Sequence, residues 1–382
     1  MSVWDEVVGQ EAATAVFREA VADPRAMTHA WLVTGPPGSG RSTAARAFAA
    51  ALQCPEQGCG RCHACTTVLG GTHPDVTLVA TEMLTISIEE TRSLVALAQR
   101  SPSQGRWRVI VVEDADRMTE RTSNVLLKAV EEPPERTVWL LCAPSPQDVV
   151  VTIRSRARLV GLRVPPPEAV ARLLVARDGV DPQVAEVCAR AAQSHVGIAR
   201  RLARDPEARR RRARLLAIPG EIRGVSDAVL AAGELVELAQ EEARAATADR
   251  DAAERAELLR SLGAEDGTNL PPSLRAQLSQ LEKDQKRRAT RAQRDVLDRA
   301  MVDLLSLFRD VLTVQLGAEV ELVNTEHAEL VRELGATSTP EQNLRRMDAI
   351  GEARTRLAGN VAPLLAVEAM MLALRPQVRP LG

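Results

Sequence analysis

The stretch AWLVTGPPGSGRSTAARAFAAAL, residues 30–52, decides the fold of this chain. An apolar run ends at Thr34, the glycine-rich loop GPPGSGRST follows at residues 35–43, and an alanine-rich helical pattern comes next. This order predicts a nucleotide-fold element, because backbone N–H groups at such a helix N-terminus can surround phosphate oxygens. The candidate nucleotide contacts of this loop are Gly35, Gly38, Gly40, Arg41, Ser42 and Thr43.

The loop departs from the usual phosphate-binding pattern at one position. Arg41 stands where G-x-x-x-x-G-K-[ST] requires lysine, and a planar guanidinium does not replace a compact ammonium. A later apolar run, RVIVVED at residues 108–114, ends on Glu113 and Asp114, the usual order of the acidic pair reversed. Such acids hold Mg²⁺ and orient the attacking water, so their reversal also weakens the expectation of ATP hydrolysis. Whether ATP or ADP binds, or the loop only turns the chain, stays open.

Three more apolar runs, at residues 75–80, 108–114 and 137–143, alternate with helical patterns. They predict an α/β fold with a parallel sheet covered on both faces. The run VPPPEAV at residues 164–170 marks a boundary, since three prolines cannot continue a helix or a central strand. We expect three domains: a P-loop NTPase-like domain at residues 1–163, a small helical domain at 164–215 and an all-α domain at 216–382. Their formal net charges are -1, +5 and -6.

The last domain reads as nearly all helix. One apolar stripe at helical spacing runs through Leu297, Met301, Leu304, Phe308 and Val311. A second is expected through Leu357, Val361, Leu364, Met371 and Leu374. The charged stretch at residues 238–296, broken by GAEDGTNLPPS, predicts an exposed hairpin or a partly mobile insertion.

Four of the six cysteines are clustered in QCPEQGCGRCHACTT. No secretory signal precedes them, so we expect a reducing, cytoplasmic compartment in which metal binding is the better interpretation than disulfides. Four thiolates at short spacing leave no open position on the metal, which predicts a structural Zn²⁺. The alternative is four reduced cysteines in a surface loop. The predicted ligands are Cys54, Cys59, Cys62 and Cys65.

Composition excludes several classes of protein. No apolar run of about 18 residues exists, which argues against a membrane protein. Aromatic residues make up 2% of the chain and tyrosine is absent, so a single-strand binder built on base stacking is not expected. A formal net charge of -2 argues against a free-standing, strongly electrostatic DNA binder.

Several motifs together resemble the clamp-loader subunits of the bacterial replicative DNA polymerase III, which belong to the AAA+ class. These are the cysteine module after the phosphate-loop helix, SNVLLKAVEEPPERTVWLLCAPSP at residues 123–146, and VTIRSRAR at 151–158. VVGQ at residues 7–10 and HVGIARRL at 195–202 are similar to the family's adenine-side and lid motifs, the latter placing Arg200 at a second sensor position. In the third motif Ala157 replaces the family's cysteine, while Ser155 and Arg156 are present. The resemblance covers about residues 5–215.

The family contains gamma/tau motor subunits, which hydrolyse ATP, and the delta-prime branch, which does not. Arg41, the reversed acidic pair and the run Ala143-Pro144-Ser145 in place of sensor threonines point to the delta-prime branch. The resemblance then implies no intrinsic ATPase activity and a role for Arg156 as an arginine finger that reaches ATP on a neighbouring subunit. It places residues 164–215 as a lid and residues 216–382 as a collar that joins subunits.

The partners implied are gamma/tau and delta subunits, with the sliding clamp and primer-template DNA reached through the complex, in the cytoplasmic, nucleoid-associated replisome. Two alternatives remain at this point. One is an active gamma/tau-type ATPase, and the other is a zinc-stabilised DNA-binding adaptor. The basic run at residues 209–214 is more often a solvated helix face than a phosphate-binding surface.

Overall fold

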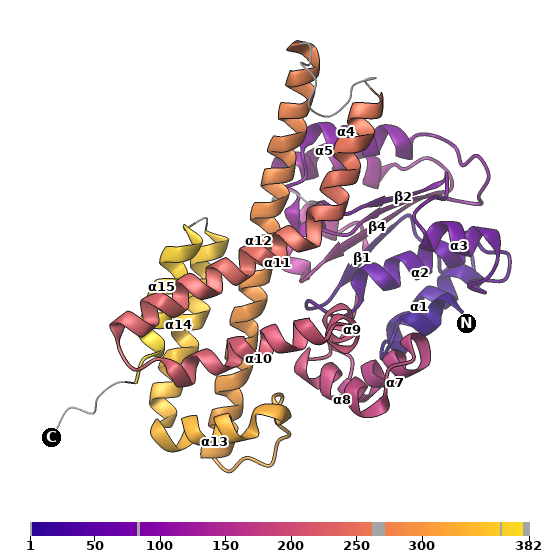
Figure 1. Cartoon of the computed structure of the whole chain (residues 1–382). Coiled ribbons are helices and arrows are strands. Elements are labelled where there is room, and N and C mark those ends of the chain that lie inside the picture. The colour runs from indigo at the N-terminus through magenta and orange to yellow at the C-terminus, as the bar shows by residue number, and fades with distance from the viewer. Residues whose placement is uncertain (1, 82–84, 262–271, 360, 377–382) are drawn as a thin grey trace. The chain divides into compact units, whose positions relative to one another are not determined.

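The structure is a computed structural model that describes residues 2–81, 85–261, 272–359 and 361–376. The chain forms two compact units, Met1–Asp205 and Pro206–Gly382, and each is described by itself (Figure 1). The division into three domains stays a prediction.

A five-stranded parallel sheet forms the centre of the first unit. Its strands lie in the order β2-β3-β4-β1-β5, and all four neighbouring pairs are parallel. This confirms the predicted parallel α/β fold. The fifth strand was not predicted from the sequence, because it is only four residues long and half of it is exposed. The strands are β1 (Ala30–Thr34), β2 (Val76–Val79), β3 (Arg108–Val112), β4 (Thr137–Ala143) and β5 (Arg158–Gly161).

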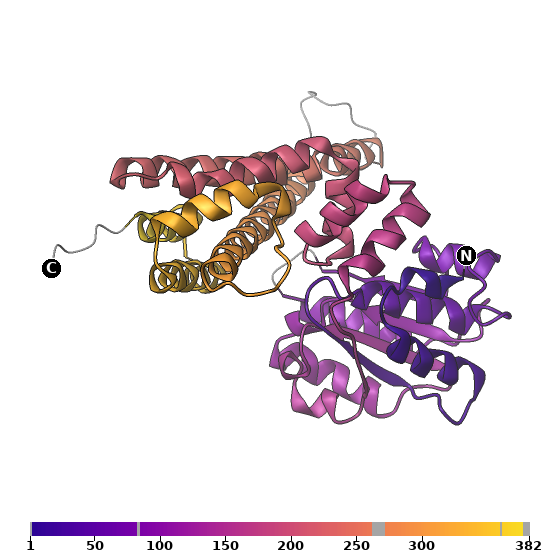
Figure 2. The same cartoon turned by 90° about the horizontal axis from the view of Figure 1, so that it is seen from below.

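Helices cover both faces of this sheet (Figure 1 and Figure 2). Successive side chains of a strand point to opposite faces, so Trp31 and Val33 pack with α1 and α2, whereas Leu32 packs with α4 and α5. The helical segments up to β5 are η1 (Val3–Glu6), α1 (Glu11–Ala22), α2 (Arg41–Gln53), α3 (His63–Leu69), α4 (Ile88–Ala98), η2 (Ala115–Arg117), α5 (Glu120–Glu131), η3 (Pro146–Asp148) and α6 (Val151–Arg154).

Three further helices complete the first unit: α7 (Pro167–Asp178), α8 (Pro182–Ala191) and α9 (Val196–Arg204). Proline stands at the start of α7 and α8, where its missing N–H leaves no intrahelical bond unmade. The side chain of Asp181 accepts hydrogen bonds from the first turn of α8, and that of His195 does so for α9. Local sequence therefore fixes where these helices begin.

Four of the aromatic side chains pack together under one face of the sheet. Phe17 lies with its ring centroid 4.6 Å from Phe48 and 5.7 Å from Trp31, and Trp4 lies 6.4 Å from Phe17. Three of these side chains are fully buried, and aromatic rings contribute the largest buried areas of a core. The cluster joins the N-terminal segment η1 to α1, α2 and β1.

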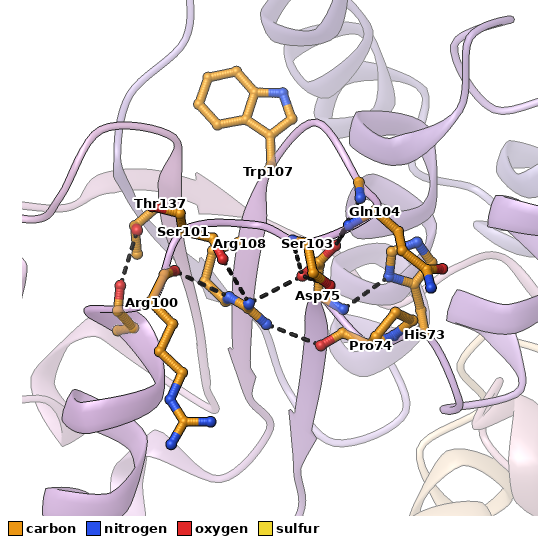
Figure 3. Close-up of polar contacts among 12 residues, drawn as sticks. His73, Pro74, Asp75, Arg100, Ser101, Ser103, Gln104, Trp107, Arg108 and Thr137 are labelled. Carbon is orange, nitrogen blue, oxygen red and sulfur yellow. Dashed lines mark hydrogen bonds and ion pairs between the residues drawn. The ribbon is translucent and has the colours of Figure 1, made fainter.

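A buried ion pair joins the segment before β2 to the start of β3 (Figure 3). Arg108 Nη2 lies 2.9 Å from Asp75 Oδ1, and both side chains are almost fully buried. The Asp75 carboxylate also accepts backbone N–H groups from residues 103–105 at 2.6–2.7 Å. Arg108 donates in addition to the carbonyl oxygens of Pro74, Arg100 and Ser101. The network therefore satisfies both buried charges and fixes the loop between α4 and β3.

The second unit is helical throughout its described residues, apart from its turns and the segment after α12. Its segments are α10 (Pro206–Glu221), α11 (Val225–Ser261), α12 (Pro272–Gln315), η4 (Thr325–His327), α13 (Ala328–Thr337), α14 (Pro340–Ala358) and α15 (Pro363–Leu374). The predicted stripe on α12 is confirmed, because all five of its residues are fully buried in this unit. No helix in the described ranges is long and apolar enough to cross a membrane.

The second predicted stripe is wrong. Val361 and Leu364 are 36% and 43% exposed, whereas Leu357, Met371 and Leu374 are buried. The chain leaves α14 at Ala358 and begins α15 at Pro363, so the five positions do not share one helix face. The helical spacing of these five positions is therefore interrupted by a helix break.

The predicted hairpin at residues 238–296 is present as the facing parts of α11 and α12 (Figure 1). Arg288 on α12 pairs with Asp251 and Glu254 on α11, and Arg255 Nη1 lies 3.1 Å from Glu282 Oε1. Charged residues of this stretch thus form ion pairs between α11 and α12. The predicted break between the helices lies for the most part outside the described residues.

The basic run on α10 is also engaged inside the second unit. Arg212 Nε lies 2.9 Å from Asp303 Oδ1, and Arg214 bonds to Glu221 and Glu234. The pKa of Arg214 is raised, chiefly by its hydrogen bond to Glu234. The run thus lies on a helix face, as expected, but Arg212 is nearly buried in its ion pair and is not solvated.

Candidate functional site

The glycine-rich loop lies at the carboxyl end of β1, directly before α2. The Gly35 N–H donates to the carbonyl oxygen of Pro144, 3.2 Å away, which ties the loop to the end of β4. Gly38 and Gly40 have φ angles of 86° and 87°, a left-handed conformation that side chains disfavour. Gly40 is the N-cap residue of α2, directly before Arg41. The loop therefore has the backbone form that the sequence pattern predicted.

Arg41 is folded back onto the loop itself. Its Nη1 donates to the carbonyl oxygen of Gly35. Its Nε is buried and has no hydrogen-bond partner within the part of the chain that the structure describes. Ser42 and Thr43 follow in the first turn of α2 and are partly exposed. The guanidinium thus lies across the loop, where a phosphate-binding lysine would extend toward a ligand.

The acidic pair at the end of β3 is neutralised by arginines. Glu113 Oε1 accepts from Arg46 Nε at 2.6 Å, and Arg46 lies on α2. Arg117 Nε lies 3.7 Å from Asp114 Oδ1. A guanidinium that occupies a carboxylate competes with a divalent cation for the same oxygens. The role of Arg46 was not predicted, because it lies five residues after Arg41 on α2, and five residues turn a helix by about 140°, away from the side of Arg41.

Residues from outside the loop hold it in place. The Gln10 side chain donates to the carbonyl oxygens of Ser39 and Arg163 and accepts from the Arg163 N–H. A Cβ on Gly38 would come within 2.9 Å of the His195 side chain, at the start of α9. The segment 7–10 and the α9 region are thus both close to the loop, as their motifs imply.

Arg200, placed at a sensor position by resemblance, is bound to a carboxylate. Its Nη2 lies 2.8 Å from Asp178 Oδ1, at the end of α7. The Asp178 side chain is 5% exposed, so this pair joins α7 to α9 inside the first unit. Arg200 therefore connects helices here, and a role toward nucleotide stays a prediction.

Arg156 lies just beyond α6, on a different element from the loop. Its side chain is 40% exposed, and Nη2 lies 2.5 Å from Glu131 Oε1 at the end of α5. Nη1 donates to the carbonyl oxygen of Thr152 and to Ser155 Oγ. The guanidinium is thus at the surface and accessible to a second molecule.

The four predicted metal ligands come together in one cluster. Their sulfur atoms all lie within 4.8 Å of one another, and Cys54 Sγ lies 3.7 Å from Cys59 Sγ and 3.6 Å from Cys62 Sγ. Four thiolates at 2.3 Å from Zn²⁺ have neighbouring sulfurs about 3.8 Å apart. Backbone N–H groups of Arg61 and Cys62 lower the pKa of Cys59 to about 6, whereas burial raises the pKa of Cys62 and of Cys65 in the absence of a metal ion. The donor set and its spacing therefore fit a structural zinc ion.

The cysteine module is attached to the core through contacts that the sequence did not reveal. The Gly58 carbonyl oxygen accepts from the Val3 N–H at 3.0 Å and from Ser2 Oγ at 2.9 Å. Gln53, the last residue of α2, bonds through its side-chain amide to the backbone of Arg106 and Trp107. The module is thus held between the N-terminus and the loop that Asp75 fixes.

Replacing Cys65 with serine should remove bound zinc and lower the thermal stability of the first unit. Three thiolates and a hydroxyl form a much weaker zinc site, and metal binding contributes directly to the folding of such modules. Metal analysis of the purified chain should find one zinc per wild-type chain. Cys188→Ser, outside the cluster on α8, is the matched control and should keep its zinc. Full zinc content in Cys65→Ser would contradict the site.

These features define a class of protein. The first unit is an α/β fold with a parallel sheet, a glycine-rich loop between β1 and α2, and a Cys₄ module after the loop helix.

Comparison with known proteins finds one matching family and several similar proteins. The family described as DNA polymerase III, delta subunit matches residues 9–166. The gamma/tau subunit of DNA polymerase III from Mycobacterium tuberculosis is 35% identical over 174 residues, covering 44% of this chain and 30% of that protein. The delta' subunit from Pseudomonas aeruginosa is 36% identical over 151 residues, covering 38% of this chain and 45% of that protein. Part of the chain is therefore similar to subunits of the bacterial DNA polymerase III, and residues 9–166 match a family of such subunits.

The residues that match the family model, 9–166, lie in the N-terminal part of the chain. The aligned region spans less than half of the length of each of these relatives. A solved DNA polymerase III gamma subunit-related protein from Thermotoga maritima covers 94% of this chain and 98% of its own, with a TM-score of 0.45 at 15% identity.

Proposed function

We propose that this chain is a delta-prime-type clamp-loader subunit that does not hydrolyse ATP. In this role it supplies Arg156 to the ATP site of a neighbouring gamma/tau-type subunit during sliding-clamp loading. The observation that carries the proposal is the pair of guanidinium groups at its own loop: Arg41 on the Gly35 carbonyl oxygen and Arg46 on Glu113. They lie where hydrolysis requires an extended lysine and a metal-binding carboxylate.

The two arginines act against hydrolysis in different ways. Arg41 replaces a point charge that contacts the terminal phosphates with a planar group of different shape. Arg46 offsets the negative charge of Glu113 and occupies its Oε1, which a magnesium ion or an attacking water would need. Restoring one of the two functions would therefore leave the other defect in place.

The surface around Arg156 supports a contact with another protein chain. Val151 on α6 is 63% exposed, and Leu159 on β5 is 52% exposed. Both lie within five residues of Arg156, and β5 is an edge strand. Large apolar side chains beside an accessible arginine are typical of protein interfaces. This arrangement favours delivery of Arg156 to a site on a neighbour.

The remaining features fit the same role. Residues 164–215 would form the lid, residues 216–382 the collar, and the Cys₄ module would hold structural Zn²⁺. The partners would be gamma/tau and delta subunits, with the clamp and primer-template DNA met through the assembled complex in the cytoplasmic, nucleoid-associated replisome. A DNA-binding adaptor has less support, because Arg212 and Arg214 of the basic run are paired within their own unit.

A second candidate is an active gamma/tau-type ATPase. It is favoured by the 35% identity to a gamma/tau subunit, which is close to the 35% and 36% identity to two delta' subunits. The arrangement of Arg41 and Arg46 argues against it.

Purified wild-type chain is expected to show no ATP turnover above background, and Arg41→Lys is expected to show none either. The variant restores the ammonium but leaves Glu113 bound to Arg46. The measurement is phosphate release with Mg²⁺ at saturating ATP, with a gamma/tau subunit as the positive control. Turnover by the wild-type chain would overturn the proposal, and turnover by Arg41→Lys alone would show that Arg46 does not disable the site.

A further inference from the structure

Glu131 and Arg156 form a contact that the proposed reaction must break. Glu131 is the last residue of α5, and its Oε1 lies 2.5 Å from Arg156 Nη2. α5 and α6 are in contact, so the two side chains approach from adjacent elements. The contact is therefore a feature of the first unit alone.

The rest of the Arg156 guanidinium is also bound within the chain. Nη1 donates to the carbonyl oxygen of Thr152 at 2.8 Å and to Ser155 Oγ at 3.2 Å. Both terminal nitrogens are thus engaged by the segment before Arg156 and by Glu131. An arginine recognises a phosphate through these same nitrogens, usually two at a time. In this orientation both N–H groups of Nη1 are used within the chain and Nη2 is drawn to Glu131, so fewer of the five N–H groups of Arg156 are left for a neighbour's phosphate.

The C-terminal end of α5 is a position at which an ion pair between Glu131 and Arg156 is favourable. A carboxylate in the last turn of a helix is disfavoured by the helix dipole, and Arg156 offsets the charge of Glu131 there. The two side chains are 40% and 36% exposed, and solvent weakens such a pair to at most about 1 kcal/mol. The contact is thus strong enough to bias the side chain and weak enough to exchange for a phosphate.

We propose that Glu131 is a positioning residue that holds Arg156 in a parked orientation until a neighbour's nucleoside triphosphate takes the guanidinium over. This inference rests on the proposed function of Arg156. It implies that Glu131 restrains hydrolysis by the neighbouring subunit. Removing its charge lowers the cost of releasing Arg156, so hydrolysis becomes faster.

The test uses the complete complex assembled with gamma/tau and delta subunits, without clamp or DNA. Glu131→Gln should raise kcat/KM for ATP by about two- to fivefold, the range that an exposed ion pair allows. Glu132→Gln, the adjacent glutamate beyond the end of α5, is the matched control and should leave the rate unchanged. Thermal unfolding of each variant chain checks that it is folded.

The same substitution in an Arg156→Ala background separates a positioning role from a structural one. If Glu131 acts through Arg156, Glu131→Gln should have no further effect there. Two results would overturn the inference and leave the proposed function standing. One is an unchanged or lower rate of ATP hydrolysis for Glu131→Gln with Arg156 intact. The other is a rise in that rate that persists in the Arg156→Ala background. If Arg156→Ala alone leaves hydrolysis unchanged, it is the proposed function that fails.

Discussion

Replacing Arg156 with alanine is expected to slow ATP hydrolysis in the neighbouring subunit by on the order of 10³-fold. The guanidinium would stabilise charge that develops on the transferred phosphoryl group, and an arginine supplied from a neighbour contributes at least this much in such reactions. Single-turnover hydrolysis in the assembled complex is the measurement, because it resolves the affected site from the unaffected ones.

Two further variants make this result specific. Arg154→Ala removes the same charge from α6, where Arg154 Nη1 donates to the Pro146 carbonyl oxygen, and should have little effect. Arg156→Lys keeps the charge without the planar fork and should give an intermediate rate. Equal losses in Arg154→Ala and Arg156→Ala would point to a general loss of assembly and contradict the assignment.

Replacing Arg108 with alanine is expected to destabilise the first unit by about 3 to 5 kcal/mol. The substitution leaves the Asp75 carboxylate buried without its cation, although the N–H groups of residues 103–105 still bond to it. All four tryptophans lie in the first unit, so denaturant unfolding followed by tryptophan fluorescence reports on it. Arg106→Ala, on the exposed part of the same loop, is the control. A loss below about 1 kcal/mol for Arg108→Ala would contradict this role.

The pH dependence of unfolding offers a second check on the same network. Burial alone would raise the pKa of Asp75, but hydrogen bonds from the backbone N–H groups of residues 103–105 outweigh it and lower the pKa from 3.8 to about 2. A depressed folded-state pKa stabilises the fold at pH values above the unfolded pKa. This contribution should therefore be complete above about pH 4 and be lost as the pH falls toward 2, and Asp75→Asn should remove that part of the pH profile.

The sequence predicted those parts of the fold that depend on local patterns. Four of the five strands could be found because each is a short apolar run between turn residues, whereas β5 exposes Leu159 and offers no such run. The α12 stripe could be found because it lies within one uninterrupted helix. The stripe across residues 357–374 failed because a helix break lies between Ala358 and Pro363.

The same distinction applies to the candidate site. The phosphate loop and the four cysteines were predictable, since each depends on spacing within about fifteen residues. The pairs Arg46–Glu113 and Arg156–Glu131 join residues 67 and 25 positions apart in the chain, and their geometry depends on how helices pack against the sheet. The buried network of Asp75 and Arg108 was missed for the same reason, because a charged side chain gives no sequence signal that it is buried.

The central claim is that this chain does not hydrolyse ATP itself and that hydrolysis in its neighbour depends on it. The most direct measurement combines this chain with one gamma/tau-type subunit whose phosphate-loop lysine has been replaced by alanine. Single-turnover ATP hydrolysis is then measured for the two proteins together. The account predicts no hydrolysis by this pair, because the loop with Arg41 and the neutralised Glu113 cannot act in its place. Residual hydrolysis that disappears on Glu113→Gln in this chain would contradict the account.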